Sequence, residues 1–284
     1  MRKSTIALII VLVVFSYVIF GSILISWLIR SQPKLPSFSK NLALIEVEGI
    51  IADPRVVVRQ IKKYSKNPAV AALVLRIDSP GGVVSATQEI YEEIKRAKER
   101  EKKIIVSMGS IAASGGYYIA TPADIIVANP GSVTGSIGVK MELPILERLF
   151  KKIGINFEVI KSKEHKDIGS PFRQMTPRER ALLQDVVNSA YEQFISVIVE
   201  NRKLPEATVR SIADGRILTG EQAIEFGLVD TLGSLEDALR IAANMVGIKG
   251  EPRVMRERKR IRITDLLFSQ LARNLLIPKL KYIP

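Results

Sequence analysis

Short apolar segments alternate with amphipathic helical segments along most of this chain after residue 40. Strands are predicted at residues 41–49, 71–77, 103–108, 125–128 and 157–160, and helices at 55–64, 84–100, 114–120, 143–153, 176–202, 221–226 and 235–246. Thr176, followed by a proline and by Glu179, has the spacing of a capping box that opens the longest helix. Strands and helices that alternate in this way favour a parallel sheet covered by helices. The sequence therefore predicts an α/β fold.

An uncharged apolar segment precedes this pattern. The 24 residues from Ile6 to Ile29 contain no charged side chain, and a helix of that length covers the roughly 30 Å hydrocarbon core of a bilayer. Trp27 and the flanking Arg2 and Arg30 are typical of residues at a membrane interface. A membrane anchor is favoured over a cleaved signal peptide, since no small-x-small site follows Trp27. Charge alone does not settle the orientation, because both flanks are basic.

The resulting domain organisation has four parts. Residues 1–30 are predicted to form a transmembrane helix, and residues 31–40, which include two prolines, to form a linker. Residues 41–248 form the catalytic domain. Residues 249–284 are a basic tail whose last part, from Thr264, has the apolar spacing of an amphipathic helix.

Composition excludes several kinds of chemistry. The chain contains no cysteine and one histidine, which excludes a cysteine nucleophile, thiolate metal sites and a zinc site built from several histidines. The net charge is +13, but the basic segments lack the interleaved aromatic residues of a single-strand binder and match no DNA-binding motif. We therefore expect no metal, no cofactor and no nucleic-acid partner.

One serine lies where small residues meet an apolar segment. Ser114, followed by two glycines, can begin a helix with its hydroxyl and the next backbone amides directed at one point, as an acyl-transfer nucleophile requires. Taken alone, it could equally be a helix cap. The base must be sought mainly among lysines, and Lys166, between turn-forming residues, is the candidate. To act near neutral pH its pKa must fall from about 10.4 to about 7–8, so its ammonium should be partly buried.

Two further turns could complete such a site. Residues 78–82 follow a buried strand, and the amides of Gly81 and Gly115 are candidates for an oxyanion hole. Ser136 could hold the lysine amine toward Ser114, or could only cap a turn. A Ser-His-Asp triad with His165 and Asp167 is disfavoured, because both flank Lys166 on the same side of an extended segment.

The order of four motifs resembles that of the signal peptide peptidase (SppA) family of membrane-bound serine peptidases in its short single-repeat form. These motifs begin at Asp78, Ala113, Thr134 and Lys166, and the resemblance spans residues 42–246. It implies a crotonase-like (Clp protease-like) fold of repeated β-β-α units, a dyad of Ser114 and Lys166, and an orienting role for Ser136. It also implies Gly81 in the oxyanion hole.

The resemblance further implies an anchored enzyme with an extracytoplasmic catalytic domain. Homo-oligomers would place active sites at subunit interfaces, and the serine and lysine of one dyad could come from adjacent copies. The expected function is hydrolysis of peptides such as cleaved signal peptides in the cell membrane. Alternatives are a stomatin-partner-type membrane protease, a crotonase-type acyl-CoA enzyme and a non-catalytic membrane scaffold.

Overall fold

The computed structural model describes residues 15–26 and 41–257, and the chain divides into two compact units, residues 1–39 and 40–284. In the first unit, residues 15–26 form a helix with exposed apolar side chains such as Phe15 and Phe20. No helix within the described ranges is both long enough and apolar enough to cross a membrane. Most of the predicted anchor and the predicted helix from Thr264 lie outside the described residues, so both stay predictions.

The second unit is built on a mainly parallel β-sheet, as the alternating pattern predicts. Its centre is formed by β1 (Asn41–Glu48), β2 (Val70–Ser79) and β3 (Lys103–Ala112), with Ile45 beside Leu75 and Leu75 beside Val106. The remaining strands are short. β4 (Ile125–Ala128) and β5 (Val133–Gly135) pair with β3, and β8 (Val254–Met255) pairs with β1. β7 (Thr231–Leu232) pairs with β4, and β6 (Ile217–Thr219) pairs with β5 in antiparallel orientation. The carboxyl ends of β2 and β3 therefore lie side by side.

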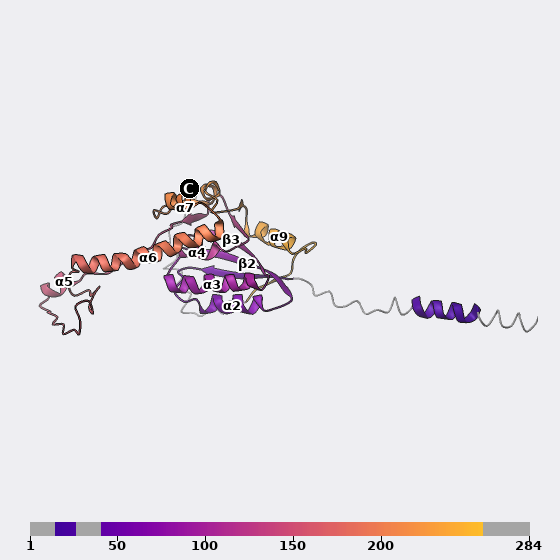
Figure 1. Ribbon diagram of the computed structural model, residues 1–284, viewed down its shortest axis with the longest axis horizontal. Helices are drawn as coiled ribbons and strands as arrows, with labels where there is room; N and C mark the ends of the chain where they lie inside the picture. Colours follow the sequence, from indigo (N-terminus) through magenta and orange to yellow (C-terminus); the bar gives the residue numbers. More distant parts are fainter. Residues whose placement is uncertain (1–14, 27–40, 258–284) are drawn as a thin grey trace, which may run out of the picture. The chain divides into compact units, whose positions relative to one another are not determined.

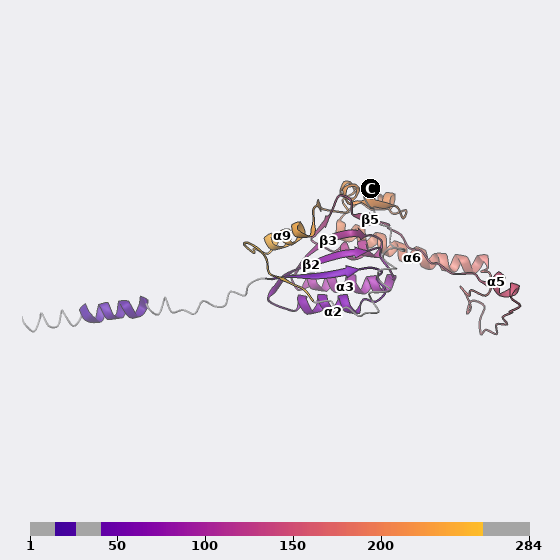
Figure 2. The ribbon, with the colours of Figure 1, turned by 180° about the vertical axis from the view of Figure 1, so that it is seen from behind.

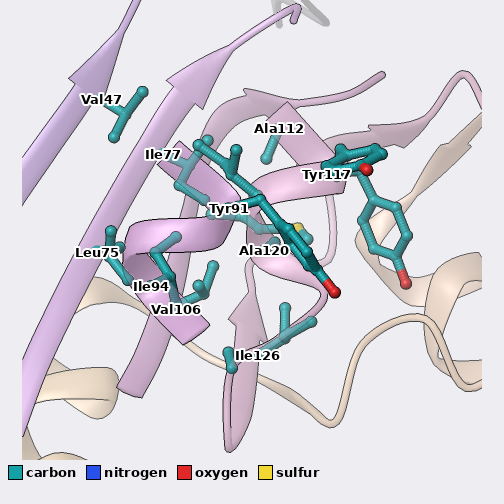
Figure 3. Close-up of a cluster of buried hydrophobic side chains, with 14 of the residues drawn as sticks. Val47, Leu75, Ile77, Tyr91, Ile94, Val106, Ala112, Tyr117, Ala120 and Ile126 are labelled. Carbon is teal, nitrogen blue, oxygen red and sulfur yellow. The ribbon is translucent and has the colours of Figure 1, made fainter. Parts of the chain in front are cut away.

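Helices cover both faces of this sheet (Figures 1 and 2). On one face lie α2 (Arg55–Ser65), α3 (Val84–Glu99), α4 (Gly115–Ala120) and the C-terminal part of α6 (Pro177–Arg202), whereas α9 (Leu235–Met245) covers the other. Alternate strand residues supply the two cores, because side chains of a strand point to opposite faces. Leu75 and Ile77 of β2 pack beneath α3, as Figure 3 shows, and Val74 packs with α9. The helices α7 (Glu206–Ile212) and α8 (Gly220–Glu225) complete the unit.

One part of the second unit extends away from this core. We call residues 141–190 the arm, and residues 41–140 and 191–257 the body. The arm contains α5 (Glu147–Lys152), an irregular segment and the N-terminal half of α6, and in both views it extends outward along the line of α6 (Figures 1 and 2). Phe157 stacks on Phe172 with ring centroids 3.9 Å apart, and Phe150 packs edge-on against both.

Two predictions of secondary structure in the arm are wrong. Residues 157–160 are not a strand, because no strand among the described residues lies beside them to satisfy their backbone groups, and Ile160 is 95% exposed. The helix predicted at 143–153 is only α5, since residues 143–146 are irregular and the amide of Leu146 donates to the carbonyl oxygen of Pro171. The strands and helices predicted in the body are confirmed within a few residues, although α7 and the short strands β5 to β8 were not predicted.

Candidate active site

Ser114 lies at the N-terminus of α4, directly after β3. Its backbone has φ 52° and ψ −120°. Residues other than glycine rarely adopt this conformation, and holding one in it costs about 1–3 kcal/mol. Three hydrogen bonds hold this turn: the Ser114 amide donates to Gly135 O (2.8 Å), the Tyr118 amide to Ser114 O (2.9 Å) and the Gly116 amide to Ala113 O (2.8 Å). The turn therefore holds a half-buried serine in a strained conformation.

Glycines enclose the serine at contact distance. A Cβ atom at Gly81 would lie 2.5 Å from the Gly115 nitrogen and 3.0 Å from the Ser114 Cβ, so any side chain at Gly81 would collide with the turn. Gly81 also has φ +98°, which only glycine adopts without strain. A Cβ at Gly116 would lie 2.6 Å from Ser79 O. The turn that ends β2 and the turn that ends β3 are therefore packed backbone against backbone.

Two amide groups beside the serine have no acceptor within the part of the chain that the structure describes. Among the described residues, the N–H groups of Gly82 and Gly115 donate no hydrogen bond, and the Gly82 nitrogen lies 3.2 Å from the position that a Cβ of Gly115 would take. The amide of Gly81, by contrast, donates to the hydroxyl oxygen of Ser79 at 3.1 Å. Backbone N–H groups that have no partner of their own can donate to an oxyanion. Gly81 would have to exchange its partner to take that role, whereas Gly82 would not.

Ser136 lies next to the backbone that holds Ser114. It follows Gly135, whose carbonyl oxygen accepts the Ser114 amide, and it also has a positive φ, of 51°. Its own amide donates to Arg216 O at 2.7 Å, which ties this turn to the approach to β6. The structure thus brings Ser114, Ser136, Gly81 and Gly115 into one region at the carboxyl ends of the central strands.

Lys166 lies elsewhere in the chain. It belongs to a series of turns in the arm, before α6, whereas Ser114 lies in the body. Figure 1 shows α5 and the start of α6 far from α4. The Lys166 side chain is exposed and makes no hydrogen bond or ion pair with any described residue. A single chain therefore does not bring Lys166 to Ser114. It also does not provide the partial burial of the Lys166 ammonium group that was predicted from the sequence.

Three residues that support the serine turn were not predicted. Ser79, fully buried, accepts the amides of Gly81 with its hydroxyl and of Ala113 with its carbonyl. The carboxylate of Asp78 accepts the Ile111 amide at 3.1 Å, and Thr87 Oγ1 lies against Gly115. Asp78 and Ser79 belong to the predicted turn at residues 78–82, so their position was visible in the sequence. Their contacts were not, because these join segments distant in sequence.

The sequence of this chain matches a family of peptidases over a range that includes the serine turn. The sequence pattern of Peptidase family S49 matches residues 96–249, a range that includes Ser114, Ser136 and Lys166. The chain belongs to this family of peptidases.

Named relatives agree with this assignment. A Synechocystis protein named as a candidate protease is 46% identical over 217 residues, which cover 76% of this chain and 78% of that protein. An Enterococcus faecium protein named as a candidate signal peptide peptidase SppA is 35% identical over 71% of this chain and 62% of its own length. The chloroplastic serine protease SPPA of Arabidopsis thaliana is 38% identical over 77% of this chain but only 31% of its own length.

Proposed function

We propose that this S49 peptidase is a serine endopeptidase that cuts peptides such as cleaved signal peptides, with Ser114 as the nucleophile. The observation that carries the proposal is the strained turn at Ser114, which packs against glycines and lies beside the unpaired amides of Gly82 and Gly115. The name of the Arabidopsis relative supports a serine mechanism, and that of the Enterococcus relative supports the substrate class. Membership in a peptidase family disfavours an acyl-CoA enzyme.

Lys166 would act as the general base. Its neutral amine takes the proton of the Ser114 hydroxyl as the oxygen attacks the substrate carbonyl, and amide donors at Gly115 and at Gly81 or Gly82 stabilise the oxyanion. The protonated lysine then gives this proton to the leaving amine, which breaks the peptide bond and leaves an ester on Ser114. Water, deprotonated by the same lysine, hydrolyses the ester. Ser136 would orient the amine.

The lysine would come from a neighbouring copy of the chain. The arm carries Lys166 away from the body of its own chain, and it exposes a series of large apolar side chains. Contiguous exposed apolar surface is typical of protein interfaces. A homo-oligomer in which each arm reaches the body of its neighbour would cover this surface, remove Lys166 from water and complete each site at a subunit interface.

The remaining parts of the proposal concern location and architecture. Residues 1–30 would anchor the enzyme in the cell membrane by a single helix, with residues 31–40 as a linker and residues 249–284 as a basic tail. The catalytic domain, residues 41–248, would be extracytoplasmic and crotonase-like in its repeated units. These statements rest on the apolar segment at residues 6–29 and on the family motifs.

A fluorophosphonate probe tests the central claim. The serine oxygen displaces fluoride and forms a bond to phosphorus, so intact-mass measurement of the full chain should show one added phosphonyl group. Ser114→Ala should abolish labelling and peptide hydrolysis, whereas Ser110→Ala, a matched change at an exposed serine of β3, should preserve both. Wild-type chain that neither labels nor cleaves peptides, or labelling that persists in Ser114→Ala, would contradict the proposal.

A further inference from the structure

The residues around Lys166 form a short series of turns. The Lys166 amide donates to Lys163 O (3.2 Å), the Ile168 amide to His165 O (3.2 Å) and the Ser170 amide to Asp167 O (3.0 Å). These local bonds shape the segment but do not attach it to another element. The side chain that does so belongs to Asp167, the residue next to Lys166.

Arg173 joins Asp167 to the start of α6. Its Nε and Nη2 atoms donate to the two carboxylate oxygens of Asp167 at 2.8 and 2.9 Å, a bidentate pair. Its Nη1 atom donates to Glu179 Oε2 at 2.8 Å, and Nη2 also contacts Oε1 of the same carboxylate. Bidentate pairs between arginine and carboxylates fix geometry as well as contributing energy. Arg173 thus clamps the Lys166 turn to α6.

The helix end of this clamp is itself fixed. Glu179 belongs to the first turn of α6, where the Thr176 hydroxyl accepts its amide and its carboxylate accepts the Thr176 amide, a complete capping box. The side chain of Glu179 is 3% exposed and that of Asp167 is 13% exposed. A polar network that is both satisfied and shielded from water is more rigid than a surface ion pair. The clamp is therefore rigid although the arm extends from the body.

All the partners of Arg173 lie in the arm. Its side chain donates hydrogen bonds to Asp167, Glu179 and the carbonyl oxygen of Gln174, and to no described residue of the body. Lys161 donates to Asp167 as well, at 2.7 Å. Loss of Arg173 should therefore leave the sheet and its helices intact, and should release the turn that precedes α6.

We propose that Arg173 is a positioning residue of the peptidase reaction, which fixes the Lys166 amine relative to α6 by clamping the adjacent Asp167. This inference rests on the proposed function, in which Lys166 is the base. A displacement of about 1 Å of a catalytic group can lower the rate about 100-fold. Loss of a clamp one residue from the base can therefore lower the rate of hydrolysis strongly. The clamp acts on Lys166 through the backbone and does not touch the substrate.

The first experiment compares Arg173→Met with Arg180→Met in the full chain. Arg180 is an exposed arginine of the same helix whose side chain makes no hydrogen bond or ion pair with the described residues, so its loss controls for the removed charge. For Arg173→Met we expect kcat for peptide hydrolysis to fall about 10- to 100-fold, with KM within about twofold. Arg173→Lys should recover part of the loss, since lysine keeps the charge but not the two-pronged geometry. Arg180→Met should match wild type.

If Arg173→Met fails to fold or assemble, a second variant tests whether the clamp positions Lys166. Asp167→Asn removes the carboxylate charge and one of the two acceptor oxygens from the other end of this link, and leaves the pairing of Arg173 with Glu179 in place. It should lower kcat by a similar factor, and the double variant Asp167→Asn, Arg173→Met should be no worse than the poorer single variant, because coupled residues are not additive. Oligomer mass should be unchanged in Asp167→Asn.

The outcomes separate this inference from the proposed function. Wild-type kcat in assembled Asp167→Asn, equal losses in Arg173→Met and Arg180→Met, or losses that multiply in the double variant would overturn the clamp. Absence of hydrolysis in wild type, or full activity in Lys166→Ala, would instead overturn the function on which it rests.

Discussion

The body and the arm bury their apolar residues to very different extents. In the body, strand residues such as Ile45, Leu75 and Val106 are fully buried between two layers of helices. In the arm, apolar side chains are exposed in a single chain, among them Ile145, Ile160 and Val186. Large apolar side chains exposed on one region of a folded chain are typical of a surface that binds a partner. The body therefore buries its apolar residues within one chain, whereas the arm has the surface expected of one side of a protein interface.

The same difference separates the two halves of the candidate dyad. Ser114 lies in the body, fixed by backbone hydrogen bonds and by glycines that admit no side chain. Lys166 lies in the arm, exposed, and only its neighbours are fixed. The Ser114 turn can form in a single chain before the oligomer assembles. Lys166, by contrast, would be buried only by contact with another copy of the chain. Four predictions test this division.

The largest expected effect concerns catalysis. Ser114→Ala and Lys166→Ala should each lower hydrolysis by at least about 1,000-fold, as loss of a nucleophile or its base does in serine proteases. If the dyad forms between copies, mixing the two variants under subunit exchange should restore activity. In a ring with one dyad per interface, random 1:1 mixing would leave about a quarter of the interfaces with both groups intact. Exchange confirmed by native mass measurement with activity at background would place the dyad within one chain.

The second prediction compares the stability of the two regions. Leu75→Ala, in the buried core of the body, should lower the free energy of unfolding by about 2–5 kcal/mol through lost burial and the cavity left behind. Ile160→Ala, at an exposed position of the arm, should change it by less than about 0.5 kcal/mol at concentrations where the chain is monomeric. Urea denaturation measures both. A loss at Ile160 as large as that at Leu75 would show that the arm is not an exposed region of the lone chain.

The third prediction tests the arm as an interface. Ile160→Ser should weaken assembly about 10- to 100-fold, since burying an isoleucine side chain contributes about 1.5–3 kcal/mol, while leaving monomer stability unchanged. Met245→Ser, at a partly exposed position of α9 in the body, is the matched control. Sedimentation velocity over a range of concentrations measures the dissociation constant. An unchanged constant in Ile160→Ser would remove this residue from the interface.

The sequence predicted the body better than the arm for a physical reason. In β1, β2 and α3 the residue pattern and the final burial agree, because each element finds its partners within the same chain. Residues 157–160 have the composition of a strand, but the described part of the chain offers them no strand to pair with. The capping box at Thr176 and Glu179 was recognised because it is local. The short strands β5 and β6 were missed because their pairing depends on segments about 80 residues apart.

The candidate site divides in the same way. The position of Ser114 at a helix start follows from its neighbours, and the structure agrees with it. The contact between Gly81 and Gly115 depends on two parallel strands ending together, which the motifs alone did not reveal. The burial expected for Lys166 is not found in the single chain, and no local pattern could supply it. Arg173 was missed because its role emerges only when Asp167 and Glu179 are brought within its reach.

The smallest expected effect concerns pH and the first turn of α6. Hydrogen bonds from Arg173 and from the Thr176 amide lower the pKa of Glu179 from 4.5 to about 2, and Arg173 and Lys161 likewise hold the pKa of Asp167 below its usual range. A carboxyl whose pKa is lower in the folded state stabilises that state above its unfolded pKa, and the stabilisation is lost as pH falls. The ionised Glu179 carboxylate should therefore stabilise the folded arm above pH 4.5, and this stabilisation should be lost as the pH falls from about 4.5 to 2.

Carbon-13 NMR titration of the Glu179 carboxyl group measures this directly. In the wild-type chain Glu179 should titrate near the low end of that window. Arg173→Met should raise the pKa of Glu179 toward 4.5, because the hydrogen bonds from Arg173 that lower it most are removed. Arg180→Met should leave it unchanged, since Arg180 does not contact the carboxylate. A Glu179 that titrates near 4.5 in the wild-type chain would mean that the clamp is open in solution. The arm would then hold Lys166 no more firmly than an ordinary surface loop.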